Sequence, residues 1–133
     1  RYLLLKRKKN WIGWEWMKGG CKKNEGDTKC LARELKEETG IVEFRPTKTK
    51  FTHTFLYPKT MKKDNGKWTG AKHKIYLVQT YTDYVSLDEN EHSDFEWLNE
   101  TDALKLLTWE DQKKVFKQII KEYIKKGKTK SKK

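Results

Sequence analysis

The chain of 133 residues is poor in cysteine, has fewer acidic than basic residues and contains no long apolar run. No stretch approaches the roughly 20 apolar residues of a membrane-spanning helix, and no signal peptide is visible, so we expect no membrane association. Cys21 and Cys30 lack the spacing and companions of a zinc site, and two cysteines are too few for a disulfide scaffold. We therefore expect reduced thiols and a cytoplasmic protein.

The charge of the chain is strongly positive. Lysine and arginine outnumber aspartate and glutamate by 31 to 19, which gives a net charge of +12. An excess of this size favours an anionic partner, such as a nucleotide polyphosphate or RNA. Part of the excess lies in residues 125–133, which hold six lysines. We interpret this segment as a disordered tail that either contacts a polyanion or, as we favour, maintains solubility. Residues 1–124 are interpreted as one domain.

Residues 28–39 predict a helix, because they contain no glycine or proline and are rich in leucine, alanine, arginine, glutamate and lysine. Asp27 is the expected N-cap. On this helix Glu34, Glu37 and Glu38 stand at positions i, i+3 and i+4, so three carboxylates share one face. Like charges this close repel unless a cation lies between them. Hard oxygen ligands suit Mg²⁺ or Mn²⁺, so this face is a candidate metal site.

The residues around the helix favour a metal site over a solvated charged face. Gly19 lies in a glycine loop that would let a backbone carbonyl approach the metal, and Gly40 is the expected C-cap. Arg33 precedes Glu37 by four residues and would also reach Glu25 from the loop. Charge-assisted hydrogen bonds from Arg33 would then fix the carboxylates.

The same residues form a spaced motif. Gly19 is followed after five residues by Glu25 and, after seven more, by the run RELKEETGI at residues 33–41. This pattern resembles the Nudix box, whose glutamates hold divalent metal ions for the hydrolysis of a nucleoside diphosphate linked to another group. The resemblance implies that Glu37 and Glu38 are metal ligands and that Gly19 offers its carbonyl. It leaves Glu34 as either ligand or general base, with Arg33 as the orienting residue.

Two further segments narrow the resemblance. WEWMKGG at residues 14–20 is similar to the Trp-x-x-Pro-Lys-Gly segment before the box of asymmetric diadenosine tetraphosphate hydrolases, with Met17 in place of the proline. EHSDFEWL at residues 91–98 is similar to that group's Glu-His-x-x-aromatic-x-Trp segment. RNA pyrophosphohydrolases share part of both patterns. The similarity implies that Glu91 is a further metal-site carboxylate; from the residues alone it is an exposed loop acid.

The remaining candidates contact the substrate. Lys18 and Lys72 fall where this group has phosphate-binding lysines, and a compact ammonium suits phosphate; otherwise they are surface lysines. Tyr57 and Tyr76 are interpreted either as core residues or as an aromatic wall for an adenine ring. The three histidines show no metal-ligand spacing and remain unassigned.

The predicted fold class is α/β. Strands are expected at 2–6, within 41–57, at 72–84 and at 95–98, and a closing amphipathic helix at 109–126. The Nudix resemblance implies an α/β/α sandwich with a mixed β-sheet. Family members usually begin with one more apolar strand, whereas this chain starts at Arg1 without a methionine, which leaves open that the sequence is a fragment.

The sequence as a whole predicts a Mg²⁺-dependent Nudix hydrolase. The expected substrates are dinucleoside polyphosphates, above all diadenosine tetraphosphate, which would give ATP and AMP. The main alternative is removal of pyrophosphate from the 5′ end of RNA, which the basic surface favours. A third hypothesis is a non-catalytic module that binds nucleotides or RNA. The complete set of carboxylates argues against it, because a binding module does not require all of the metal ligands.

Overall fold

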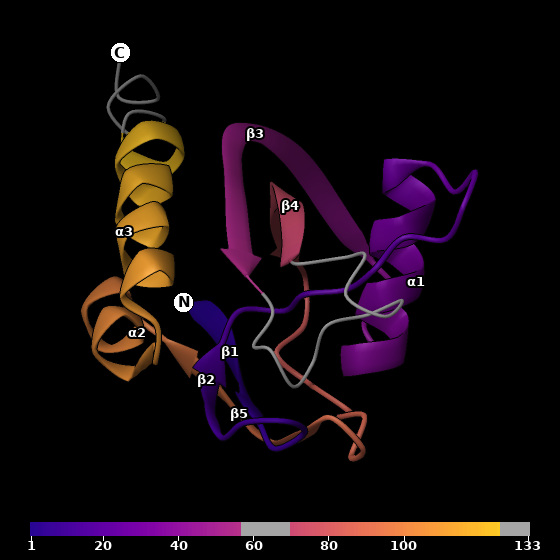
Figure 1. The fold of residues 1–133 in the computed structure, drawn as a ribbon, viewed down its shortest axis with the longest axis horizontal. Helices are drawn as coiled ribbons and strands as arrows, with labels where there is room; N and C mark the ends of the chain where they lie inside the picture. The colour runs from indigo at the N-terminus through magenta and orange to yellow at the C-terminus, as the bar shows by residue number, and fades with distance from the viewer. Residues whose placement is uncertain (57–69, 126–133) are drawn as a thin grey trace.

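The computed structural model describes the backbone of residues 1–56 and 70–125 and the side chains of residues 1–53 and 73–125. Figure 1 shows the arrangement of its helices and strands. In chain order these are β1 (Tyr2–Arg7), β2 (Gly13–Glu15), α1 (Asp27–Thr39), β3 (Phe44–Leu56), β4 (Gly70–Thr80), β5 (His92–Leu98), α2 (Glu100–Leu106), α3 (Glu110–Ile119) and the π-helix η2 (Ile120–Lys125). No helix in these ranges is long and apolar enough to cross a membrane.

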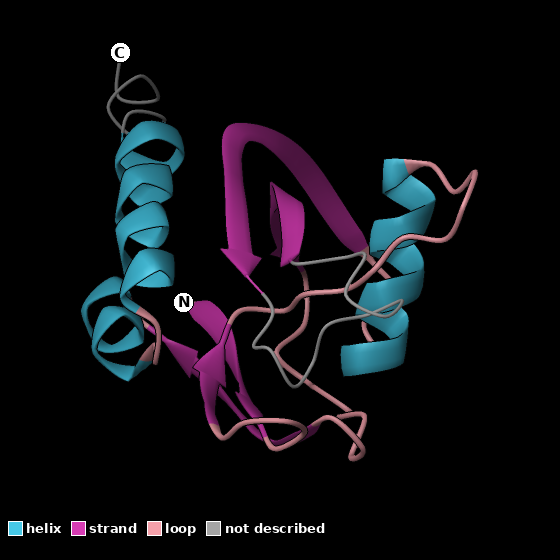
Figure 2. Cartoon of the chain, viewed as in Figure 1, coloured by secondary structure: helices cyan, strands magenta, loops and turns pink. Residues whose placement is uncertain are grey.

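The strands form two sheets, with α1 on one side and α2 and α3 on the other (Figures 1 and 2). One sheet has the order β2-β1-β5, and the other pairs β3 with β4. The predicted α/β class is confirmed. Every pairing between strands in the described ranges is antiparallel, whereas the resemblance implied one mixed sheet.

Strand β1 is the centre of its sheet and is covered on both faces. Leu4 belongs to a core cluster with Ala103, Leu107, Phe116 and Ile120, which joins β1 to α2, α3 and η2. The neighbouring Leu3 packs against a second cluster, made by Leu35 of α1 with Ile41 and Val85. Successive side chains of a strand point to opposite faces, so this one short strand ties both helical layers to the sheet.

Helix α1 ends as predicted but begins differently. Gly40 has a φ of 76°, and its N–H donates to the carbonyl of Lys36, which confirms the glycine C-cap. The N-cap is Gly26, so the prediction that Asp27 caps the helix is wrong. Asp27 is the first helical residue, and its carboxylate instead accepts a hydrogen bond from the hydroxyl of Tyr76. That tertiary contact occupies the side chain that would have capped the helix.

The second half of the chain contains one helix more than expected. Helix α2 is capped by Asn99, whose side chain accepts a hydrogen bond from the N–H of Asp102 at 2.8 Å. The closing helix is divided into α3 and the π-helical η2. Lys125 ends η2 and lies 3.5 Å from a carboxylate oxygen of Glu100, so it is not part of a tail. The rest of the predicted tail, residues 126–133, lies outside the described residues.

Candidate metal and substrate site

The three carboxylates of α1 lie in different environments. Glu38 is 5% exposed and points into the protein. The side chain of Glu34 is 13% exposed, whereas that of Glu37 is 56% exposed. All three line a single large cavity, and Glu38 is the most buried of them.

Arg33 holds the loop before α1 against the helix. Its Nε and Nη2 each donate to one carboxylate oxygen of Glu25 at 2.8 Å, and Nη2 also donates to the carbonyl oxygen of Gly20 at 2.8 Å. Its Nη1 lies 2.7 Å from Glu34 and 3.3 Å from Glu37. The predicted contacts with Glu25 and Glu37 are therefore confirmed. Hydrogen bonds from Arg33, followed by one from the backbone of Lys22, lower the pKa of Glu25 to about 2.

Gly19 makes room for Glu34. A Cβ atom built on Gly19 would lie 2.3 Å from the carboxylate carbon of Glu34, which is far inside van der Waals contact. The same atom on the neighbouring Gly20 would meet nothing within 4 Å. The loop therefore needs glycine at position 19, because only a residue without a side chain allows the backbone to approach this carboxylate so closely.

Glu38 and Glu91 meet at the buried end of the carboxylate set. Burial raises the pKa of Glu38 to about 9, aided by its hydrogen bond with Glu91 and by the negative charges of Glu91, Glu34 and Glu15. Glu91 comes from the loop just before β5, so the expected approach of a loop carboxylate to the helix is present. Oε2 of Glu38 is buried and has no hydrogen-bond partner among the described residues.

A divalent cation fits this group of residues. The donors are hard carboxylate oxygens, and Oε2 of Glu38 is buried without a partner among the described residues. Burial first, and then the hydrogen bond with Glu91 and repulsion from the neighbouring carboxylates, raise the pKa of Glu38. A bound cation removes that repulsion, and carboxylate oxygens are the ligands that Mg²⁺ and Mn²⁺ prefer. When bound there, such an ion supplies Lewis-acid polarisation of phosphate oxygens and lowers the pKa of a coordinated water.

Lys18 is held at the cavity by a buried carboxylate that the sequence did not reveal. Its Nζ lies 3.0 Å from Oε1 of Glu15, which is fully buried. Nε2 of His92 lies 3.0 Å from the other oxygen of Glu15, and Nη1 of Arg7 lies 3.3 Å from it. Burial acts to raise the pKa of Glu15, but the bonds from His92 and Lys18 and the charge of Arg7 outweigh it and lower that pKa. Three basic groups thus converge on one buried acid.

The other predicted substrate residues are only partly described. Tyr76 lines the cavity, and its hydroxyl donates to Asp27 on the first turn of α1. Lys72 lies in β4 opposite Thr54, but its side chain is not among those described. Tyr57 lies outside the described residues.

The cavity connects these side chains. It has a volume of about 1270 Å³. Its wall includes the candidate metal-site carboxylates Glu34, Glu38 and Glu91 together with Lys18, and it also includes Gln112 of α3. The wall of the cavity thus includes residues of both α1 and α3, the helices on opposite sides of the sheets (Figure 1).

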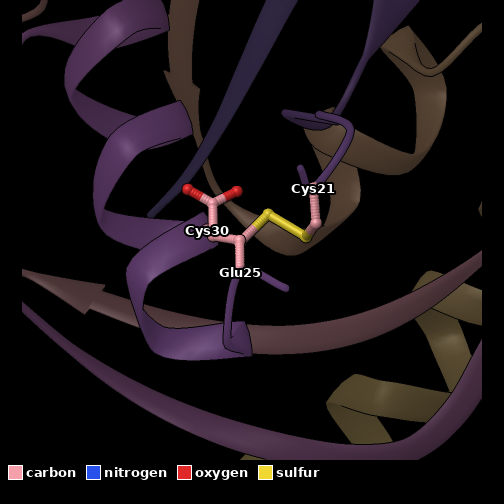
Figure 3. Close-up of side chains that lie close together, drawn as sticks. All are labelled: Cys21, Glu25 and Cys30. Atoms are coloured by element: carbon pink, nitrogen blue, oxygen red, sulfur yellow. A yellow bond between two sulfur atoms is a disulfide. The ribbon is translucent and has the colours of Figure 1, made fainter. Parts of the chain in front are cut away.

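The two cysteines form a disulfide, so the expectation of reduced thiols is wrong. Cys21 follows the glycine loop and Cys30 lies in the first turns of α1, with their Cα atoms 5.3 Å apart (Figure 3). The segment between them folds back because Arg33 holds both Glu25 and the loop. Disulfides persist mainly in oxidising compartments, so this bond argues against the cytoplasmic location, which stays a prediction.

Figure 3 also shows Glu25 beside this disulfide. In the described part of the chain, Cys21, Glu25 and Cys30 are the only group of at least three potential ligand residues with atoms all within 4.8 Å of one another. Both sulfurs are consumed by the disulfide, so this group is not a metal site. Glu34, Glu38 and Glu91 do not form such a group, although Glu38 and Glu91 share a hydrogen bond.

A family model described as the NUDIX domain matches residues 1–119. The chain therefore belongs to the Nudix family and is a hydrolase of the pyrophosphohydrolase type. No curated protein matches it.

Solved structures share the fold at low identity. The chain is similar to the E. coli dihydroneopterin triphosphate pyrophosphohydrolase, with 18% identity over 89% of this chain and 84% of that one and a TM-score of 0.73. It is also similar to a Nudix hydrolase of Listeria monocytogenes, with 20% identity over 88% and 79% and a TM-score of 0.66. The Ap4A hydrolase of C. elegans has 23% identity over 88% and 81% and a TM-score of 0.64. Likeness at these identities establishes a common fold.

Proposed function

We propose that the protein is a Mg²⁺-dependent hydrolase of dinucleoside polyphosphates and that diadenosine tetraphosphate is its substrate, giving ATP and AMP. The observation that carries this proposal is the size of the cavity, together with the charged side chains in its wall. Its volume of about 1270 Å³ exceeds the roughly 300–1,000 Å³ typical of small-ligand sites, and carboxylates and a lysine line its metal-site end. A long substrate with a polyphosphate in the middle suits such a space.

The carboxylates of the site have separate proposed roles in hydrolysis. Glu37, Glu38 and Glu91 are the proposed ligands of Mg²⁺, with Mn²⁺ as the alternative ion and the carbonyl of Gly19 as a further ligand. Glu34 either binds the metal or accepts the proton of the attacking water. The water oxygen forms a bond to phosphorus as the bond from that phosphorus to the bridging oxygen breaks, and the departing phosphate takes the electron pair.

The remaining residues position the groups that react. Arg33 fixes Glu34 and Glu37 through the hydrogen bonds described above. Lys18 offers a positive charge to phosphate while Glu15 holds its ammonium in place. Lys72 is proposed as a second phosphate-binding lysine, and Tyr76 as a wall for an adenine ring.

Removal of pyrophosphate from the 5′ end of RNA is a second candidate. The net charge of +12 favours it, because RNA offers many phosphates beyond the one that is cleaved. The two reactions use the same carboxylates. They differ in how strongly turnover depends on salt, since every additional phosphate contact steepens that dependence.

A panel of substrates tests the proposal. Diadenosine tetraphosphate, triphosphorylated RNA, ADP-ribose and nucleoside triphosphates are each incubated with the protein and Mg²⁺, and products are identified by chromatography and mass spectrometry. We expect the fastest turnover with diadenosine tetraphosphate and equal amounts of ATP and AMP. Faster turnover of RNA would favour the second candidate. That turnover should then fall steeply as salt rises from about 50 to about 200 mM, because salt weakens each phosphate contact.

A further inference from the structure

Gln112 of α3 has an unused hydrogen-bonding group. Its side chain is 1% exposed, and its Oε1 has no hydrogen-bond partner among the described residues. Gln112 also lines the cavity that holds the metal-site carboxylates. An amide withdrawn from water without a partner is destabilising. Because this amide lies at a cavity wall, we infer that a ligand supplies the missing hydrogen bond to Oε1.

Two aromatic residues, Trp16 and His53, line the same cavity as Gln112. Their rings meet edge to face, with centroids 5.7 Å apart. Oδ2 of Asp111 lies 2.8 Å from Nε2 of His53, and Oδ1 accepts a hydrogen bond from the backbone N–H of Gln112 at 2.9 Å. Asp111 thus links the histidine of β3 to the backbone of Gln112 on α3, which places His53 near the start of α3.

The unpaired atom limits what the ligand can be. Oε1 only accepts, so the ligand must present an N–H or O–H donor to it. The amide N–H₂ beside it donates, so an acceptor next to that donor completes a two-bond contact. Adenine has this edge, with an exocyclic amino group beside a ring nitrogen, and glutamine pairs with it in this way elsewhere. The nearby indole and imidazole rings supply apolar surface for a flat ring.

We propose that Gln112, Trp16 and His53 form a binding site for the adenine ring of the substrate, with the amide of Gln112 contacting the amino edge. The inference rests on the proposed function, because it assigns one part of the cavity to a nucleoside whose phosphates reach the carboxylates. The proposed site should select a purine with an amino group at position 6.

Binding measured without turnover tests this assignment. The probes are AMP, purine riboside 5′-monophosphate, which lacks the amino group, and ribose 5-phosphate, which lacks the base. Isothermal titration with Mg²⁺ present gives each dissociation constant. We expect the wild type to bind AMP at least about tenfold more tightly than purine riboside monophosphate, since a site built to bond a polar group rejects the analogue without it.

Variants at two glutamines of α3 complete the test. Gln112→Leu should weaken AMP binding at least about tenfold and leave ribose 5-phosphate binding unchanged. Gln118→Leu, at an exposed position of the same helix, should bind AMP as the wild type does. If Gln112→Leu does not fold, Gln112→Glu keeps the shape and should show the same loss for AMP.

Two failures remain distinguishable. Equal AMP affinity in the wild type and in a folded Gln112 variant would overturn the adenine site, whatever the turnover. Equal affinity of the wild type for AMP and purine riboside monophosphate would do the same. Absence of hydrolysis of any dinucleotide, with selective AMP binding retained, would instead remove the proposed function and leave the base site standing.

Discussion

Gly19 and Glu34 show how closely the backbone approaches the metal-site carboxylates. An added methyl group at position 19 overlaps the carboxylate of Glu34. Gly19→Ala should therefore displace Glu34 and lower kcat by roughly tenfold or more, as expected when a catalytic group moves by about 1 Å. Steady-state kinetics with diadenosine tetraphosphate measure the change.

Gly20→Ala is the matched control, because the added methyl group meets open space. It should keep the wild-type kcat. Equal effects of the two alanine variants would show that loop flexibility, rather than the Glu34 contact, determines the loss.

Glu25 links folding stability to acid. Its pKa is lowered from 4.5 to about 2, first by the hydrogen bonds from Arg33. A carboxyl with a lower pKa in the folded state contributes stability that is complete above the unfolded value near 4.5 and is lost as the pH falls toward 2. Glu25→Gln should thus be less stable than the wild type at pH 7, and the difference should shrink below pH 4.5.

Urea unfolding at pH 7, 4 and 3 checks the Glu25 prediction. The exposed Glu89→Gln is the control and should match the wild type at each pH. A Glu25→Gln deficit that stays constant across this pH range would mean that the carboxylate charge does not stabilise the loop.

At the scale of residues, local contacts were predictable and those between distant strands were not. The contact of Arg33 with Glu37 follows from sequence, because residues four apart meet on one face of a helix. Glu15 and His92 lie 77 positions apart and meet only because β2 and β5 both pair with β1. No periodicity or spacing in the sequence indicates that pairing. Gln112 was missed because the orientation of its amide depends on the packing of α3.

At the scale of helices and strands, the feature that could not be predicted is the disulfide between the glycine loop and α1. Helix α1 was predictable within one residue, since its composition, spacing and glycine C-cap are local. Helix α2 has only 7 residues, too few for a clear apolar period. The disulfide depends on the path of the intervening loop, which Arg33 determines through tertiary hydrogen bonds. The small number of cysteines therefore led to the wrong prediction of reduced thiols.

The disulfide should stabilise the loop that carries the box. Cys21→Ser opens a loop with a sequence separation of 9 between the two cysteines. The free energy of unfolding should fall by about 2–4 kcal/mol, because the unfolded chain gains conformational freedom. Denaturant unfolding with and without dithiothreitol measures the effect.

Reductant provides the internal control for the disulfide. It should lower the stability of the wild type to that of Cys21→Ser and leave the variant unchanged. Two free thiols per folded wild-type chain without reductant, with equal stability of both proteins, would show that the bond does not form in solution.

For the molecule as a whole, the candidate metal site, the cavity and the net charge of +12 all support the proposed hydrolysis of a polyphosphate. Both helical layers contribute to the wall of the cavity, because α1 brings Glu34, Glu37 and Glu38 and α3 brings residues such as Gln112. The family and fold class were evident from the sequence, because the motif lies within one short segment and its residue types and spacing are enough to identify it. The cavity joins residues from most of the chain, so its extent required the structure.

The most direct test of the central claim compares Glu38→Gln with Glu43→Gln, a substitution at an exposed position just after α1. Turnover of diadenosine tetraphosphate and the Mg²⁺-induced shift in Tm are measured for each variant. Glu38→Gln preserves shape but removes a buried ligand charge, so kcat should fall by about a hundredfold or more, and Mg²⁺ should no longer raise Tm. Glu43→Gln should behave as the wild type. Near-wild-type turnover of Glu38→Gln at saturating Mg²⁺ would contradict the assignment of the metal site.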